Sequence, residues 1–325
     1  MGQRQSPRTV AMSVVASSAL LLAACGSSED GGDSAGSGDN LSGDIIIDGS
    51  STVAPLTEPV AAMFQQENPD VRVSVGTSGT GGGFEKFCNG ETAISDASRQ
   101  ISDEEKQACE QAGIRWDEIT VANDALSVVV NPNNPVNCVS VEQLQAIYGP
   151  EATATSWADV PGLEQPFNEQ LQIFSPGADS GTFDYFTEAV NGEEGAARSQ
   201  GVNIVGEDDN ATVTGVAGSP GGVGYFGYSY FQENEDRLKA LEIRNESGEC
   251  TAPTVDATQS GAYNPLGRQL YIYPSAEALQ RPEVAAFVNY FLDNVNEVAP
   301  KAGFIPLTDE QLQEAKDKVA SLTSG

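Results

Sequence analysis

Short apolar segments alternate with segments of helical periodicity along this chain, and this alternation limits the fold more than any other feature. Residues 44–48 (DIIID) and 71–75 (VRVSV) have the length and composition of strands. Between them, residues 53–64 carry apolar side chains at helical spacing, and Pro55 falls in the first turn, where a missing N–H group is tolerated. Strands that alternate with helices predict an α/β fold with mainly parallel sheets.

The alternation continues to the end of the chain. Ser102 opens a capping box (SDEE) for a helix that Gly113 ends, and Ser140 caps another helix. Residues 126–130 have the pattern of a buried strand that stops at the turn-rich residues 131–135 (NPNNP), where we expect the chain to cross between lobes. Further strands are expected at 171–174, 222–231 and 270–273, and further helices at 183–190, 282–295 and 308–322.

The N-terminal residues have the order of an export signal. Arg4 and Arg8 precede an uncharged apolar run, residues 10–24, which is shorter than the about 20 apolar residues of a membrane span. The run ends in Leu-Ala-Ala-Cys, which resembles the lipobox of bacterial lipoproteins, so we expect a signal peptide at residues 1–24 and a lipid on Cys25. An ordinary signal peptide with an incidental cysteine is the alternative. Residues 25–42 are rich in Gly, Ser and Asp and predict a flexible tether.

The charge and the lack of histidine exclude several function classes. The chain has 16 Lys and Arg against 47 Asp and Glu, a net charge of −31, so nucleic acid is not an expected partner. It contains no histidine. Nucleophilic sites of the Ser-His-Asp and Cys-His kinds therefore cannot form, and the sequence argues against an enzyme. We expect neither a metal nor a cofactor.

Cysteine usage agrees with export. Apart from Cys25 there are four cysteines, which allow three pairings. The closeness of Cys88 and Cys109 along the chain favours a Cys88–Cys109 disulfide with a Cys138–Cys250 disulfide, in an oxidising compartment. A zinc site is the alternative, but the chain has no CxxC spacing and no histidine.

Three times the chain runs from a strand through a Gly/Ser/Thr loop into a helix, at residues 49–52, 77–83 and 179–182. A helix start presents free N–H groups and the positive end of a dipole, and small residues let an oxyanion approach the backbone. Each loop alone also fits an ordinary turn and cap, but three together favour an anion site. The glycine run is not a nucleotide P-loop, because Phe84 follows it in place of Lys-Ser/Thr.

Four ordered motifs resemble the phosphate-binding proteins of bacterial phosphate ABC importers (the PstS family). The resemblance extends from about residue 43 to the C-terminus. It implies a type II periplasmic-binding-protein-like fold, with mixed sheets flanked by helices and one phosphate ion held in the cleft between two lobes. It also implies the permease subunits of an importer as partners. The motifs are DGSSTVAPL (48–56), GTSGTGGGF (76–84), ISDASR (94–99) and DSGTF (179–183).

The expected lobe limits follow from the crossing at residues 131–135. Lobe I is expected to comprise residues 43–130 and 255–325, and lobe II residues 131–254. The resemblance places hydroxyl and backbone donors to phosphate in both lobes. In lobe I these are Ser51 and Thr52 of the first loop and Thr80, with Ser78 as its neighbour, in the second; in lobe II they are Ser180, Gly181 and Thr182.

Two charged residues complete the expected site. Asp96 matches the buried carboxylate that accepts a hydrogen bond from the proton of phosphate, and a helix or turn cap is its alternative role. Some family members carry an arginine four residues before the far-lobe serine, where this chain has Pro176. We expect Arg99 to replace it, with Ser98 adding a hydroxyl, because an arginine fork suits a tetrahedral oxyanion. A surface ion pair is the alternative for Arg99.

Three functions remain open at this point. The first is capture of phosphate for an importer by an exported protein anchored to the outer face of the cell membrane, with closure of the lobes around the ion. The second is binding or sensing of another tetrahedral oxyanion. The third is a secreted phosphoester hydrolase that uses Ser180 or Thr182, against which the lack of histidine argues.

Overall fold

The computed structural model describes residues 41–165, 167–206, 208–245 and 247–324. Asn40–Gly325 forms one compact unit. The expected signal peptide (1–24), Cys25 and the tether as far as residue 40 lie outside the described residues. Within the described ranges, no helix combines the length and the apolar character needed to cross a membrane.

The expected alternation of strands and helices is confirmed. The first elements are β1 (Gly43–Gly49), α1 (Ala54–Glu67), β2 (Val71–Gly76), α2 (Gly79–Cys88), β3 (Ile94–Ala97), α3 (Asp103–Ala112), β4 (Ile119–Val130), β5 (Cys138–Val139) and α4 (Val141–Tyr148). Next come η1 (Trp157–Asp159), β6 (Gln172–Ser175), α5 (Gly181–Asn191), β7 (Val202–Ile204), α6 (Asp209–Gly218), β8 (Gly222–Gly227), α7 (Tyr228–Gln232), β9 (Lys239–Ala240), β10 (Glu242–Arg244) and β11 (Cys250–Thr251). The last are α8 (Val255–Gln259), β12 (Gly267–Pro274), η2 (Ala278–Gln280), α9 (Pro282–Lys301) and α10 (Asp309–Ser324).

One expected strand is half helix. The prediction of a strand over residues 222–231 is wrong in its second half, because β8 ends at Gly227 and residues 228–232 form α7. The ring of Phe226 at the end of β8 packs edge-on against the ring of Tyr230 in α7, with ring centres 5.4 Å apart. A glycine-aromatic run fits either period, and tertiary packing selects the helix.

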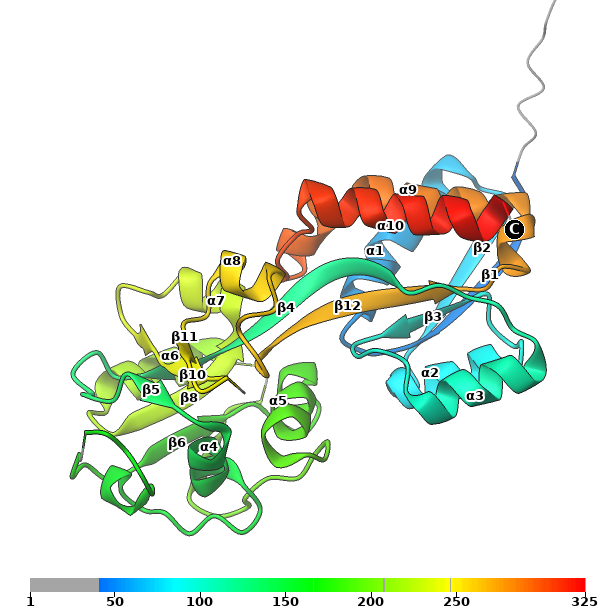
Figure 1. Cartoon of the computed structure of the whole chain (residues 1–325). Helices are drawn as coiled ribbons and strands as arrows, with labels where there is room; N and C mark the ends of the chain where they lie inside the picture. The colour runs from blue at the N-terminus through cyan, green and yellow to red at the C-terminus, as the bar shows by residue number, and fades with distance from the viewer. Residues whose placement is uncertain (1–40, 166, 207, 246, 325) are drawn as a thin grey trace, which may run out of the picture. The chain divides into compact units, whose positions relative to one another are not determined.

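The strands form one large mixed sheet and one small sheet. The order in the large sheet is β2-β1-β3-β12-β4-β8-β6-β7, with β9 paired to β4, and the small sheet has the order β11-β10-β5. Pairing is parallel within β2-β1-β3 and within β8-β6-β7, and antiparallel where β12 and β4 join them. Figure 1 shows β4 and β12 as long strands side by side that connect the two groups of elements.

Helices cover both faces of the sheet on each side of β4 and β12. Around β1, β2 and β3, α1, α9 and α10 lie on one face, and α2 and α3 on the other (Figure 1). Around β6 and β8, α4 and α5 contribute to one core cluster and α6 to another. These layers bury an apolar core on each side of the strand pair.

The two main core clusters divide within β4 rather than after it. Ile119 and Val121 pack in the cluster of α1 and α9, whereas Leu126 and Val130 pack in the cluster of α4 and α5. The lobe limits at 130/131 and 254/255 stay a prediction, and this core membership favours placing the end of β4 in lobe II.

Both expected capping boxes and both expected disulfides are present. Ser102 with Glu105 caps α3, Ser140 with Gln143 caps α4, and Gly113 ends α3 in the left-handed conformation. The disulfides join Cys88 to Cys109, which links α2 to α3, and Cys138 to Cys250, which links β5 to β11.

Candidate functional site

A cavity of about 380 Å³ lies at the carboxyl ends of β1, β2 and β3, opposite α5. Six of the residues expected to bind phosphate line it: Ser51, Thr52, Ser78, Thr80, Ser98 and Arg99. Its other lining residues are Ser50, Gly79, Gly81, Gly82, Asp184, Tyr185, Glu188, Glu194 and Arg268. The first two predicted anion loops therefore meet in one cavity.

The first loop is held directly against β3. The Ser50 N–H group donates to the backbone oxygen of Asp96 at 2.9 Å, and the Ser50 hydroxyl accepts from the Thr52 N–H group at 3.2 Å. Gly49 has φ +148°, and a Cβ atom there would lie 2.0 Å from the backbone oxygen of Asp96. Only glycine allows this approach, which places the loop beside Asp96.

The second loop is fixed by side chains of β1 and β3. The N–H group and the hydroxyl of Ser78 both donate to Oδ1 of Asp48, at 3.0 and 2.6 Å. The hydroxyls of Thr80 and Ser98 lie 3.1 Å apart, and the Ser98 N–H group donates to the Thr80 hydroxyl at 3.2 Å. Thr80 and Ser98 thus face the cavity as a pair, whereas the Ser78 hydroxyl has its proton committed to Asp48.

Asp96 is buried behind the first loop and is not among the described residues that line the cavity. The Thr57 hydroxyl donates to its Oδ2 at 2.7 Å, but Oδ1 is buried and has no hydrogen-bond partner within the described residues. Burial raises the pKa of the Asp96 carboxyl to about 7; the Thr57 hydrogen bond opposes this rise and the charge of Asp48 adds to it. Burial of a carboxylate oxygen without a hydrogen bond costs folding free energy, so we expect Oδ1 of Asp96 to receive a donor.

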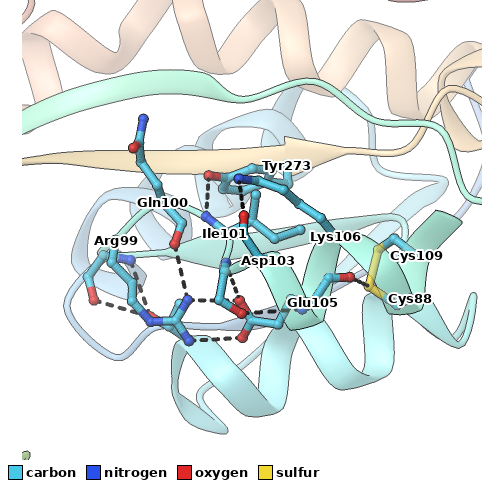
Figure 2. A network of polar contacts seen from close by, with 12 residues as sticks. Cys88, Arg99, Gln100, Ile101, Asp103, Glu105, Lys106, Cys109 and Tyr273 are labelled. Atoms are coloured by element: carbon cyan, nitrogen blue, oxygen red, sulfur yellow. Dashed lines mark hydrogen bonds and ion pairs between the residues drawn. A yellow bond between two sulfur atoms is a disulfide. The ribbon is translucent and has the colours of Figure 1, made fainter.

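Arg99 lines the cavity but is already paired. Its two terminal nitrogens donate to the two carboxylate oxygens of Glu105, both at 2.8 Å, as Figure 2 shows. The pKa of Arg99 is raised, mainly by this hydrogen bonding. Burial alone would raise the pKa of Glu105, but the hydrogen bonds from Arg99 and Ser102 lower it. The charge of the Arg99 guanidinium in the cavity wall is therefore largely balanced by Glu105, which also takes part in the capping box of α3.

The expected far-lobe donors lie next to the cavity rather than in its wall. Ser180, Gly181 and Thr182 are not among the described lining residues. A Cβ atom on Gly181 would nevertheless lie 3.5 Å from the Thr52 hydroxyl, so the start of α5 approaches the first loop. Ser180 caps α5 without a side-chain cap hydrogen bond. The N-terminus of α5 thus retains donor capacity close to Thr52.

A second arginine, Arg268 of β12, enters the cavity wall. Its Nε donates to the buried carboxylate of Asp124 at 3.2 Å, and its Nη2 donates to the Thr52 hydroxyl at 3.3 Å. Only 13% of the Arg268 side chain is exposed. A cation so well shielded from water interacts more strongly with an anion than a surface cation does.

Three carboxylates, those of Asp184, Glu188 and Glu194, also line the cavity from α5 and the loop after it. Burial raises the pKa of the Glu194 carboxyl, and the charge of Asp184 raises it further. Burial likewise raises the pKa of Asp184, and the charge of Glu188 adds to it. The α5 side of the cavity is therefore acidic, while the loops of lobe I contribute neutral donors and Arg99, and β12 contributes Arg268.

The comparison with protein families agrees with this architecture. The family model for the PBP superfamily domain matches residues 33–295 of the chain. The chain belongs to the PBP superfamily. The two-lobed α/β fold with mixed sheets, expected from the sequence, is the fold of this family.

Relatives within the PBP superfamily extend over most of the chain. The protein SphX of Synechococcus elongatus is 43% identical over 283 residues, which cover 86% of this chain and 82% of that protein. The phosphate-binding protein PstS of Staphylococcus saprophyticus is 39% identical over 302 residues, 92% of this chain and 90% of that protein. The crystal structure of "a possible phosphate binding protein" from Planctomyces limnophilus has a TM-score of 0.81 at 38% identity and covers 87% of this chain and 99% of that one.

Sequence reasoning missed the four other charged residues that line the cavity of this PBP superfamily domain: Arg268, Asp184, Glu188 and Glu194. Arg268 stands in a strand with no glycine-rich or hydroxyl-rich motif, 216 residues after Thr52. The acidic residues follow the DSGTF motif at helical spacing, and Asp184 and Glu188 share one face of α5 as residues four apart do. That spacing is the one signal that could have indicated an acidic face toward the cleft.

Proposed function

We propose that this chain captures inorganic phosphate in the cavity between its lobes and delivers the ion to an ABC importer. The observation that carries the proposal is the buried Oδ1 atom of Asp96, which lacks a donor within the described residues and lies behind a loop of neutral donor groups. The relative at 39% identity, named a phosphate-binding protein, and the solved structure at 38% identity, described as a possible phosphate binding protein, support the same ligand.

The chemistry of Asp96 favours phosphate over oxyanions that carry no proton near neutral pH, such as sulfate. Phosphate keeps a proton near neutral pH, whereas sulfate has none. An ionised Asp96 accepts a hydrogen bond from phosphate but repels sulfate, and this difference produces selectivity. Because desolvation strengthens both effects, a buried carboxylate discriminates better than an exposed one.

The remaining ligand contacts are proposed from the lining residues. Ser51, Thr52, Thr80 and Ser98 donate hydroxyl or backbone hydrogen bonds from lobe I, and Arg99 adds a cationic donor. Ser180, Gly181 and Thr182 reach the ion when the lobes close, since Gly181 already approaches Thr52. Ser78 acts on the site mainly by shaping the second loop, because its hydroxyl donates to Asp48.

Calorimetry with a panel of oxyanions tests the proposal. The chain without residues 1–25 is titrated with phosphate, arsenate, sulfate and molybdate at about pH 7.5, where an ionised Asp96 can accept a hydrogen bond from a protonated ligand. We expect phosphate to bind most tightly. Sulfate should bind at least about 100-fold more weakly, because it offers no proton to the buried Asp96 carboxylate and leaves that charge unpaired. Tighter binding of sulfate or molybdate would assign the cavity to another oxyanion, the second function considered above.

We also propose export and lipid anchoring through Cys25, with residues 25–42 as a tether that holds the binding domain off the membrane. The support comes from the order of basic, apolar and small residues before Cys25. In a bacterial host the wild-type chain should incorporate labelled fatty acid and sediment with membranes. Cys25→Ser should do neither, and equal labelling of both proteins would remove the anchor from the proposal.

A purely binding role fits the relatives best. The relatives and the solved structure described above are named as binding proteins or by protein name alone, and none is named as an enzyme. We propose no catalytic activity for Ser180 or Thr182. Turnover of a chromogenic phosphoester that disappears in Ser180→Ala would contradict this.

A further inference from the structure

Asp48, near the end of β1, connects the two anion loops of lobe I. It directly precedes Gly49, where the first loop begins, and its Oδ1 accepts both hydrogen bonds from Ser78 in the second loop. Its Oδ2 accepts from Nζ of Lys86, on α2, at 2.5 Å. Neither Asp48 nor Lys86 is among the described residues that line the cavity. The Asp48–Lys86 pair therefore lies outside the cavity lining, with 13% of the Asp48 side chain and 40% of the Lys86 side chain exposed.

Asp48 also lies one register position from Asp96 in the sheet. Strands β1 and β3 are parallel, with Asp48 opposite Ser95 and Gly49 opposite Asp96. The Ser50 N–H group, two residues after Asp48, donates to the backbone oxygen of Asp96. The two side chains leave opposite faces of the sheet, since Asp48 contacts Lys86 of α2 and Asp96 contacts Thr57 of α1. A charge on Asp48 therefore acts on Asp96 through the thickness of the sheet, where water screens it less than at the surface.

The other elements around Asp96 present neutral groups. Helix α1 contributes the Thr57 hydroxyl, and β12 places Ile272 opposite Asp96. The charge of Asp48 is the ionic influence that raises the pKa of Asp96. Lys86 balances that charge: burial alone would raise the pKa of Asp48, but hydrogen bonds from Lys86 and Ser78 hold it below its usual value. The net charge that Asp96 experiences therefore depends on both members of the pair.

We propose that the Asp48–Lys86 ion pair sets how strongly the cavity separates protonated from unprotonated oxyanions. This inference rests on the proposed function, because it concerns the carboxylate that reads the ligand's proton. Asp48 and Lys86 are positioning residues, which act through Asp96 and through Ser78. They determine the pH range in which Asp96 is an acceptor and not a donor.

Two conservative variants separate this electrostatic role from a merely structural one. Asp48→Asn removes the negative charge and keeps an acceptor for Ser78, so the pKa of Asp96 should fall. Lys86→Gln keeps a donor for Asp48 but leaves its charge unbalanced, so the pKa of Asp96 should rise. Each shift should be on the order of 0.5 to 1 pH unit. Structural damage would instead move both variants in the same direction.

The first measurement is a carboxyl ¹³C NMR titration of Asp96 in the ligand-free chain without residues 1–25, with the signal assigned from Asp96→Asn. We expect opposite shifts in the two variants and a return toward the wild-type midpoint in the double variant. Lys106→Gln is the matched control, because Lys106 forms an exposed ion pair with Asp103 on α3. Equal midpoints, or shifts of the same sign, would overturn the proposal.

The second measurement is sulfate affinity against pH. Sulfate does not titrate in this range, so the pH dependence of its binding reports groups of the protein. Asp184 and Glu194, whose pKa is also raised, are common to all the variants, so a difference between variants reports Asp96. Sulfate should bind as the pH falls through the Asp96 midpoint, at lower pH in Asp48→Asn and at higher pH in Lys86→Gln. A pH profile of sulfate binding that is unchanged in both variants would overturn the link to selectivity. Failure of the wild type to bind phosphate would instead refute the proposed function. The NMR titration would still decide whether the Asp48–Lys86 pair changes the pKa of Asp96.

Discussion

The guanidinium carbon of Arg268 lies 3.4 Å from the centre of the Tyr185 ring, so a side chain of β12 stacks on a side chain of α5. The same guanidinium donates to Asp124 of β4 and to Thr52 of the first loop. Tyr185 is fixed in turn, because its hydroxyl donates to the backbone oxygen of Pro265 at 3.1 Å. One cation therefore joins elements on both sides of the cavity and faces the place where an anion would bind.

Replacement of Arg268 by glutamine should weaken phosphate binding by about 10- to 100-fold, as expected for loss of a hydrogen bond to a charged group. Arg268→Lys keeps the charge but not the planar fork, and should recover only part of the affinity. Calorimetry measures both. The control is Asp124→Asn, which keeps the cation and should bind phosphate at least as well as the wild type. An Arg268→Gln protein with wild-type affinity and an unchanged melting temperature would exclude a role in binding.

Asp96→Asn should stabilise the ligand-free protein above about pH 7, because the folded-state pKa of Asp96 is raised to about 7 from a usual value of 3.8. Such a carboxyl binds more protons when folded, so stability falls as the pH rises between these values. The asparagine side chain does not titrate. The stability advantage of the variant should therefore grow by about 1.4 kcal/mol per pH unit through that window and then level off. Urea unfolding at about pH 5 and about pH 8 measures it, and an equal advantage at both values would refute the raised pKa.

Asp96→Asn should also narrow the difference in affinity between phosphate and sulfate. An amide offers a donor as well as an acceptor and carries no charge, so the substituted side chain no longer repels an unprotonated oxyanion. We expect weaker phosphate binding and stronger sulfate binding, with the ratio of the two dissociation constants reduced at least about 10-fold. Calorimetry at about pH 8, above the midpoint of Asp96, provides both constants. If wild type and variant discriminate equally, Asp96 does not read the ligand's proton.

Arg99→Ala should weaken phosphate binding more than loss of a surface ion pair could. An exposed pair is worth at most about 1 kcal/mol, or roughly fivefold in affinity, and we expect a loss of at least about 10-fold. Glu105→Gln tests the pairing from the other side. It leaves the Arg99 guanidinium with less of its charge balanced, so phosphate should bind more tightly. Unchanged affinity in both variants would leave Arg99 as the partner of Glu105 and nothing more.

The two disulfides should differ in their effect on stability. Cys88 and Cys109 are separated by 21 residues and Cys138 and Cys250 by 112. Loop entropy then predicts losses of about 3 and about 5 kcal/mol when each pair is replaced by alanine. Urea unfolding of the two double variants compares them. A larger loss for the shorter loop would show that contacts between α2 and α3, rather than loop entropy, dominate.

Much of the fold could be predicted from the sequence because its signals are local. Alternating apolar segments, the Ser102 and Ser140 capping boxes and the glycine-rich loops each depend on residues within one or two turns. The motif at residues 94–99 located Asp96 and Arg99 by resemblance. The prediction for 222–231 failed in its second half because a glycine-aromatic stretch is compatible with both periods, and the chain leaves the sheet after Gly227 to form α7.

The sequence alone therefore predicted the α/β alternation, three loops of a kind that suits an anion, the disulfide pairing that the structure shows and the carboxylate expected to read a proton. The tertiary structure decided which of these groups are free to act. It paired Arg99 with Glu105, brought Arg268 to Thr52 from 216 residues away, and turned Asp184, Glu188 and Glu194 toward the cavity. The physical reason is the sheet order, in which β12 runs between β3 and β4. Arg268 of β12 therefore meets Asp124 of β4 and Thr52 of the first loop across sequence separations that no local pattern encodes.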